Sequence, residues 1–158
     1  QLIIRKAVTL DHCALDTGGT RKSLRLLRFI RTLPGCENAT IEFLAADTAV
    51  RETARIIGET RITEEDYLTG RVFPDAVAYT FYFVDLHTDT GVIHRFLPDG
   101  VVPTIPFGAL IPKAANRLLT AGRTISSDRI AHSALRVQAS CMAMGQAAGA
   151  AAALGVKM

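Results

Sequence analysis

Three ionisable side chains in the middle of the sequence are spaced so that they could move a proton. Asp85 and His87 are separated by one residue, so in a strand they would share a face, about 7 Å apart along it. A carboxylate beside an imidazole is suited to acid–base catalysis, although a structural ion pair would have the same spacing. His94 completes the residue types of a two-histidine, one-carboxylate iron site. One loosely spaced histidine is weak support for iron, so we predict no metal.

A second group of residues, nearer the end of the chain, is suited to holding an anion. Gly122 and Arg123 follow a short apolar run, residues 118–121, that is typical of a buried strand. A polar connection leads from there to Arg136, which we expect in the first turn of a long helix over about residues 135–154. The N–H groups and the positive dipole end of a helix start favour negative charge. The succession therefore predicts a site for a phosphorylated or electron-accepting ring.

Two side chains beside this predicted helix start have more than one interpretation. His132 could contact the bound ring, cap the helix or face solvent. Cys141 lies among alanines, which favours a buried, unreactive thiol over a redox nucleophile.

The central ionisable group is expected to lie on a hairpin. Residues 76–87 are rich in aromatic residues, and we predict a single strand over this range. Residues 89–91 (DTG) are typical of a turn and lead into a second strand over residues 92–96. Alternation along the first strand places six side chains on one face: Val77, Tyr79, Phe81, Phe83, Asp85 and His87.

Other segments flank this hairpin. Apolar residues at helical spacing predict an amphipathic helix over residues 20–32, and residues 63–66 (TEED) predict a helix N-cap. Residues 55–59 (RIIGE) form a predicted strand. Three prolines in residues 101–112 exclude a helix there and favour an irregular or edge strand.

The final predicted helix carries no charge between Val137 and Val156, which nominally meets the length criterion for a membrane span. We do not predict a span, because the segment is built on alanine and contains polar residues such as Gln146. Small residues recur at i, i+4 spacing and favour the close approach of a sheet or a cofactor. They form two stripes: Ala139, Ala143, Ala147 and Ala151 on one, Gly145 and Gly149 on the other.

Composition excludes several classes of protein. With 158 residues, 49% of them hydrophobic, and a mean hydropathy of +0.23, the chain can bury a core and is not globally disordered. Its three cysteines have no metal-binding spacing, and their odd number argues against a disulfide scaffold. We therefore predict a reducing, cytoplasmic location. The chain opens on Gln1 in strand-like sequence, with no signal-peptide pattern, so we expect it to be part of a longer protein.

The net charge of +3 is unevenly distributed. Residues 1–106 have a balance of −2, whereas residues 107–158 have a balance of +5 and contain a single acid, Asp128. This excess favours an anionic partner at the end of the chain. An alternative hypothesis is a non-enzymatic binding or assembly module that contacts nucleic acid or an acidic partner through the basic stripe in residues 21–31. A solvated helix face is the simpler explanation of that stripe.

Six stretches resemble, in the same order, motifs of the FAD-dependent oxidoreductases that have a glutathione-reductase-like two-domain fold. The resemblance covers about residues 14–157 and does not identify a substrate. The stretches are residues 34–39 (PGCENA), 50–59 (VRETARIIGE), 68–76 (LTGRVFPDA), 119–126 (LTAGRTIS), 131–137 (AHSALRV) and 141–149 (CMAMGQAAG).

The resemblance implies an α/β fold and FAD as the cofactor of a two-electron, hydride-transfer reaction. Residues 1–100 would be a strand-rich portion of the substrate domain, with a hairpin, and residues 101–158 would be the C-terminal part of the FAD-binding domain. In the family, the helix start that matches residues 133–138 faces the pyrimidine edge of the flavin, which is negative when reduced. The implied cofactor-binding residues are Gly122, Arg123, Ser133, Arg136, Val137 and Gln138, and the implied catalytic pair is Asp85 and His87.

Two features depart from the family pattern. The strand–GxGxxG–helix unit that binds the FAD pyrophosphate is not found in these residues, since residues 16–20 (DTGGT) lack the spacing. Gly108 stands where many members have a larger polar or basic residue. We therefore expect a C-terminal portion of an enzyme. Its expected partners are FAD, a small-molecule substrate, the nucleotide-binding half (in the same protein or as a separate chain) and possible further copies of itself, with no nucleic acid and no membrane.

Overall fold

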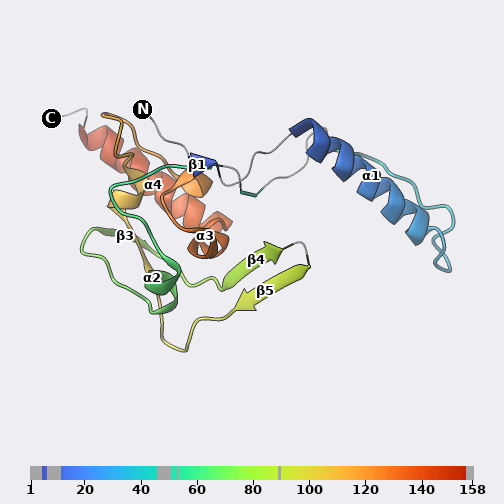
Figure 1. Ribbon diagram of the computed structural model, residues 1–158, viewed down its shortest axis with the longest axis horizontal. Helices are drawn as coiled ribbons and strands as arrows, with labels where there is room; N and C mark the ends of the chain where they lie inside the picture. Colours follow the sequence, from blue (N-terminus) through green and yellow to red (C-terminus); the bar gives the residue numbers. More distant parts are fainter. Residues whose placement is uncertain (1–4, 7–11, 46–50, 53, 89, 156–158) are drawn as a thin grey trace. The chain divides into compact units, whose positions relative to one another are not determined.

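A computed structural model describes residues 5–6, 12–45, 51–52, 54–88 and 90–155 (Figure 1). Over these residues the fold is mixed α/β, with two-stranded antiparallel sheets and α-helices, as the α/β prediction required. The chain divides into two compact units, Val8–Thr53 and Ala54–Met158, and the second also includes Gln1–Ala7. Strand β1 (Arg5–Lys6) pairs with β2 (Ala54–Arg55) in this larger unit.

The smaller unit contains helix α1 (His12–Ile30). The helix predicted over residues 20–32 is confirmed, and it begins eight residues earlier than expected. Residues 16–20 lie within α1, so they form a helix and not a phosphate-binding loop. The helix ends before Gly35, whose φ of +82° suits glycine. Basic and apolar side chains are both exposed along it: Arg21, Lys22, Arg25 and Arg28, and Leu24, Leu26 and Phe29.

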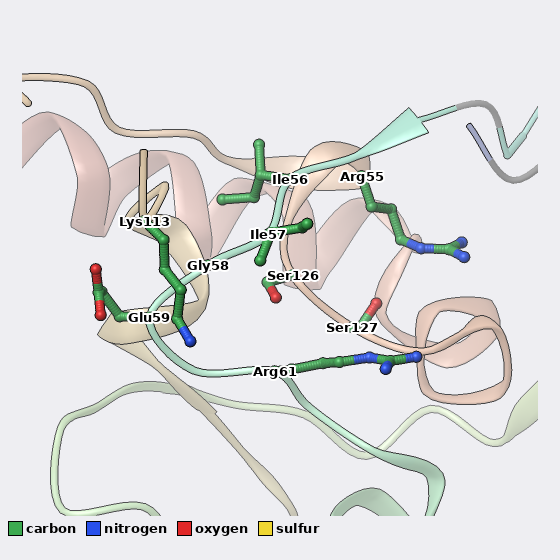
Figure 2. A pocket seen from close by; sticks show the side chains of 9 residues that line it. All are labelled: Arg55, Ile56, Ile57, Gly58, Glu59, Arg61, Lys113, Ser126 and Ser127. Carbon is green, nitrogen blue, oxygen red and sulfur yellow. The ribbon is translucent and has the colours of Figure 1, made fainter. Parts of the chain in front are cut away.

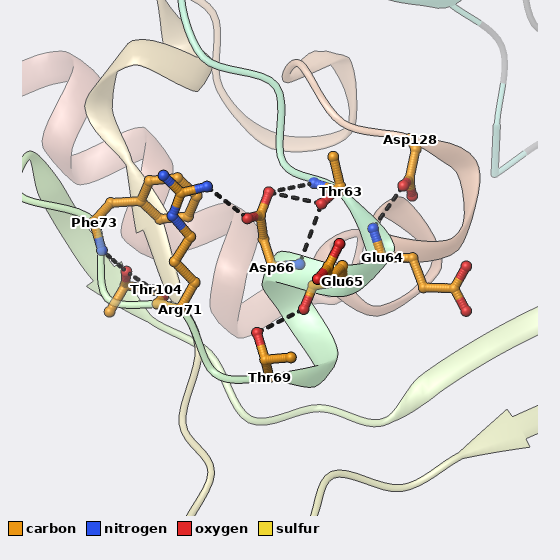
Figure 3. Close-up of polar contacts among 9 residues, drawn as sticks. All are labelled: Thr63, Glu64, Glu65, Asp66, Thr69, Arg71, Phe73, Thr104 and Asp128. Carbon is orange, nitrogen blue, oxygen red and sulfur yellow. Dashed lines mark hydrogen bonds and ion pairs between the residues drawn. The ribbon is translucent and has the colours of Figure 1, made fainter.

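Helix α2 (Glu64–Leu68) begins with the capping box that the sequence predicts. The Thr63 hydroxyl accepts a hydrogen bond from the Asp66 amide at 3.2 Å, and the Asp66 carboxylate accepts from the Thr63 amide at 2.9 Å (Figure 3). Arg71 donates to the same carboxylate at 2.7 Å. Partial burial opposes ionisation of Asp66, but the bonds from Arg71 and Thr63 outweigh it and lower its pKa.

The prediction of one continuous strand over residues 76–87 is wrong. It is split into β3 (Ala76–Tyr79), which pairs with β6 (Thr104–Pro106), and β4 (Val84–Thr88), which pairs with β5 (Gly91–Arg95). Thr80, between the two strands, is buried, whereas Tyr79 and Phe81, from the predicted common face, are 72% and 77% exposed. Because β3 and β4 pair with different strands, no continuous ladder runs through residues 80–83. The predicted β4–β5 hairpin itself is confirmed.

Two further predicted strands are not formed as expected. Of residues 55–59, only Arg55 lies in a strand, and residues 118–121 are irregular, with Leu118 42% exposed. Residues 101–112 contain the short strand β6, but the predicted exclusion of helix is wrong for Phe107–Leu110, which form a 3₁₀ helix, η1. A second 3₁₀ helix, η2 (Gly122–Thr124), follows the irregular run. Backbone hydrogen bonds to neighbouring loops replace the ladders that longer strands would have made.

The helix predicted over residues 135–154 is confirmed except at its start, where a separate short helix precedes it. Helix α3 (Arg129–Leu135) ends at Arg136, and α4 (Gln138–Gly155) begins after Val137 (Figure 1). Asp128 is the N-cap of α3 and accepts a hydrogen bond from the Ala131 amide at 2.8 Å. Residues 129–135 of the predicted polar connection are therefore helical. No helix within the described part of the chain is both long and apolar enough to cross a membrane.

The core of the larger unit joins segments that lie far apart in the sequence. Helix α3 packs on α2 and β4, and α4 packs on β3, η1 and η2. The buried face of α4 is formed by Ser140 and Met144 rather than by the predicted stripes, and Gly145 and Gly149 are exposed. The buried apolar residues that form this core cluster are Ile62, Tyr67, Val84, Ile105, Ala109, Leu110, Ile125, Ala131, Ala134, Leu135 and Met144.

Candidate functional site

The β4–β5 hairpin brings the three predicted ionisable side chains together. Asp85 is cross-strand partner to His94, and His87 follows two residues along β4. The Asp85 carboxylate lies 3.4 Å from His87 Nε2 through one oxygen and 3.2 Å from His94 Nε2 through the other. Both imidazoles are about half exposed, whereas the carboxylate is largely covered. An ionised Asp85 can therefore orient both rings and stabilise positive charge on either one.

Two arginines at the ends of α3 hold this hairpin. Arg136 Nη2 donates to the Asp85 carbonyl oxygen at 2.8 Å, and Arg129 Nη2 donates to the His87 carbonyl oxygen at 3.2 Å. Helix α3 packs on β4, as Figure 1 shows. The structure thus places Asp85 next to Arg136, a residue that the sequence assigned to a separate group. Arg129 was missed, and its spacing of seven residues from Arg136, two helical turns, is the signal that could have found it.

Gly122 and Arg123 lie in η2, against α3 and α4. Gly122 has a φ of +74°, and a Cβ there would meet Cys141 Sγ at 3.7 Å, so the turn lies close to α4. His132, only 1% exposed, donates from Nε2 to the Arg123 carbonyl oxygen at 2.8 Å, which requires the hydrogen to be on Nε2. Its ring therefore anchors η2 to α3 instead of capping a helix or facing solvent.

Cys141 is a half-buried thiol with a weak hydrogen bond from Sγ to the Leu135 carbonyl oxygen at 3.9 Å. Burial raises its pKa, an effect that the positive charge of Arg123 only partly offsets. A thiol with a raised pKa is less often the reactive thiolate, in agreement with the unreactive cysteine that the sequence predicts.

The remaining predicted cofactor residues lie at the junction between α3 and α4. The Val137 carbonyl accepts from the Cys141 amide at 3.0 Å, so the first turn of α4 follows Val137 and the exposed Gln138 opens it. Ser133 is buried in α3, and its hydroxyl donates to the Ile130 carbonyl oxygen at 2.7 Å. The helix therefore starts at Gln138, the last residue of the expected range 133–138, and Arg136 lies before the start.

The residues at this junction fit one edge of a flavin. The opening of α4 is exposed at Gln138, and the first-turn amides of a helix have no acceptor within it. Arg136, the C-cap of α3, lies two residues before this opening, and its guanidinium group donates to the Asp85 carbonyl oxygen. An electron-rich ring edge requires such donors. Among the described residues, no group of three His, Cys, Asp or Glu side chains is placed to hold a metal ion.

Comparison with known proteins defines the class. Residues 8–158 match the model of a protein family described as FAD dependent oxidoreductase, and the chain belongs to that family. Its members are FAD-dependent oxidoreductase enzymes, as the resemblance implied. No curated protein and no solved structure matches the chain.

Proposed function

We propose that this chain forms the flavin-ring side of a FAD-dependent oxidoreductase and carries its acid–base group. The observation that carries the proposal is the 2.8 Å bond from Arg136 to the Asp85 carbonyl oxygen, because it joins the two candidate groups of residues into one site. Gly122, Arg123, Arg136, Val137 and Gln138 would line the flavin, and the buried Ser133 would form the wall behind them. FAD, when bound, supplies two-electron (hydride) transfer.

In this proposal, the residues of the hairpin handle the substrate proton. His87 takes the proton on its imidazole, and Asp85, 3.4 Å away, stabilises the imidazolium that results. His94 holds the other oxygen of Asp85, so the carboxylate keeps its orientation. Arg136 and the first turn of α4 favour negative charge on the flavin edge.

The proposal keeps the finer expectations drawn from the resemblance. Residues 1–100 would be a portion of the substrate domain and residues 101–158 part of the FAD-binding domain, with the pyrophosphate held by residues outside this chain's sequence. A small-molecule substrate, a cytoplasmic location and possible self-association belong to the same proposal. The family match includes α1, so the oxidoreductase hypothesis is favoured over a non-enzymatic module built on residues 21–31.

The test is anaerobic bleaching of the flavin absorbance in the intact protein, with a panel of small molecules to find a reductant. His87→Gln is expected to slow bleaching by roughly 100-fold or more, because acid–base groups contribute about 10²–10⁴, and to leave the flavin content unchanged. Val92→Thr, on the facing strand opposite His87, is the control and should react like the unaltered protein. Equal rates for His87→Gln and the control would remove His87 from the mechanism.

Arg136→Gln tests the flavin side separately. Loss of the positive charge should make the midpoint potential of the bound flavin more negative, by about 30 mV for each tenfold loss in preference for the reduced form. An unchanged potential at full flavin content would show that Arg136 does not face the ring.

A further inference from the structure

A pocket of about 260 Å³ lies in the larger unit, with a lining distinct from the residues assigned above. Its lining combines the segment from Arg55 to Arg61 with Lys113 and the pair Ser126 and Ser127 (Figure 2). Three cationic side chains, Arg55, Arg61 and Lys113, line it together with a single carboxylate, that of Glu59. The lining therefore attracts anions.

Ser127 supplies an independent sign of a ligand. It is 6% exposed and lines the pocket, and its Oγ has no hydrogen-bond partner among the described residues. Buried hydroxyls are almost always paired, because an unpaired one loses its bonds to water without replacement. Figure 2 shows its side chain between those of Arg55 and Arg61. An oxygen atom of a bound anion would complete its hydrogen bonding.

The walls of the pocket are held by backbone hydrogen bonds between three segments. The Lys113 amide donates to the Ile57 carbonyl oxygen at 2.9 Å, and the Ile62 amide donates to the Ser126 carbonyl oxygen at 3.1 Å. Gly58 lies so close to the opposite wall that a Cβ there would be 2.7 Å from Ser126 Cβ. These contacts fix the serine pair relative to the cationic segment before any ligand binds, which lowers the ordering cost of binding.

We propose that this pocket binds the carboxylate or phosphate group of a small molecule. Its volume suits such a group and a few attached atoms, and is below the usual range for a whole drug-sized ligand. Guanidinium groups match the two oxygens of a carboxylate or phosphate, and Lys113 and Ser127 add further donors. The inference does not rest on the proposed flavin role, since none of these residues belongs to that site.

The test is calorimetric titration of the intact protein with inorganic phosphate and with acetate, in a buffer free of other oxyanions. Ser127→Ala, Arg61→Gln and Lys113→Gln should each weaken binding by about tenfold or more, because each removes a donor to a charged group. Arg25→Gln removes the same charge from the exposed face of α1 and should bind like the unaltered protein. Ser127→Ala should also unfold at the same or a higher temperature without anion, since it removes an unpaired buried hydroxyl.

Two further measurements identify the source of the group. If only protein stripped of FAD binds the anions, and the pocket variants also lose flavin, the pocket holds a phosphate of the cofactor. If flavin-loaded protein binds them and the variants keep their flavin, it holds the acidic group of a substrate. The proposal is overturned if the unaltered protein binds neither anion, if the pocket variants bind as tightly as it does, or if Arg25→Gln weakens binding as much as they do. The potential of Arg136→Gln tests the flavin proposal independently of these results.

Discussion

Tyr67 shows at the scale of a single residue how a buried polar group joins distant segments. Its hydroxyl donates to the Tyr82 carbonyl oxygen at 2.7 Å and lies 3.2 Å from Thr80 Oγ1. Thr80 Oγ1 in turn lies 3.1 Å from Ser140 Oγ on α4. The chain of hydrogen bonds crosses the core between α2 and α4, at the point where the predicted long strand is interrupted. Burial raises the pKa of Tyr67 to about 12, against a small opposing effect of Thr80.

Tyr67→Phe should therefore change both stability and its dependence on alkaline pH. Loss of the hydrogen bonds is expected to cost about 1 kcal/mol at neutral pH. In the unaltered protein the folded pKa lies above the ordinary value of 10.0, so the folded state resists ionisation. Its stability should fall as the pH rises from 10 to 12, by roughly 2–3 kcal/mol at most. Urea unfolding at several pH values measures this loss of stability. If Tyr67→Phe loses as much stability between pH 10 and 12 as the unaltered protein, the pH dependence comes from another group.

At the scale of the elements, short turns and caps determine the arrangement more than regular strands do. Asp128 caps α3 and also accepts a hydrogen bond from the Glu64 amide at 2.6 Å, so one carboxylate joins the starts of two helices (Figure 3). Gly58 and Gly108 permit the segments around the pocket to lie in contact. A Cβ on Gly108 would be 2.5 Å from Thr60 Oγ1.

Gly58→Ala is expected to destabilise the protein, by about 1–3 kcal/mol or more, because its Cβ would collide with Ser126 and with the Gly108 carbonyl oxygen. Gly149→Ala is the matched control. No atom lies within 4 Å of a Cβ at Gly149, and alanine favours a helix over glycine by roughly 1 kcal/mol, so stability should rise. Urea unfolding midpoints give both values. If Gly58→Ala is as stable as the unaltered protein, the segments around Ser126 and Gly108 can shift to make room for the Cβ at little energetic cost.

At the scale of the whole molecule, family membership and the content of the sequence lead to an expectation about cofactor retention. The chain belongs to a FAD-dependent family, yet its 158 residues contain no GxGxxG motif for the pyrophosphate. In the proposed arrangement the flavin residues of this chain would contact only one end of the cofactor. Most of the binding energy for the dinucleotide would then come from residues that this sequence does not include.

The 158-residue chain, expressed alone, should therefore be colourless or bind FAD weakly. Its flavin content after purification, read from the visible absorbance, is the measurement. Stoichiometric, tightly bound flavin would contradict the division of labour proposed here. A gel shift with nucleic acid at low salt, in the same preparation, tests the basic stripe of α1, and the absence of any salt-dependent shift would exclude the alternative module.

Local patterns predicted well those features that depend on neighbouring residues. Three elements were predicted correctly: the helix cap at Thr63 and Asp66, the helix containing residues 20–30, and the β4–β5 hairpin. Each is determined by side chains a few positions apart. The proximity of Asp85 to His87 follows from the same short spacing. Among the site residues, the cross-strand contact of His94 with Asp85 followed from the predicted turn.

Local sequence patterns did not predict the features that depend on contacts between distant residues. The strand over residues 76–87 divides because its first half pairs with β6 and its second half with β5, with the buried Thr80 between the two halves. The break at Arg136 and Val137 places the guanidinium on the Asp85 carbonyl oxygen, 51 residues away. Such long-range hydrogen bonds leave no period in the local sequence.

The sequence by itself determined the family, the capped and amphipathic helices, the hairpin and the identity of the ionisable residues, since these depend on motif order and short-range spacing. Only the tertiary structure decided that Arg136 adjoins Asp85 and that Arg55, Lys113 and Ser127 line one pocket. The reason is that backbone N–H and C=O groups at the ends of strands and helices need hydrogen-bond partners. Which residues become those partners depends on the packing of segments that are distant in the sequence.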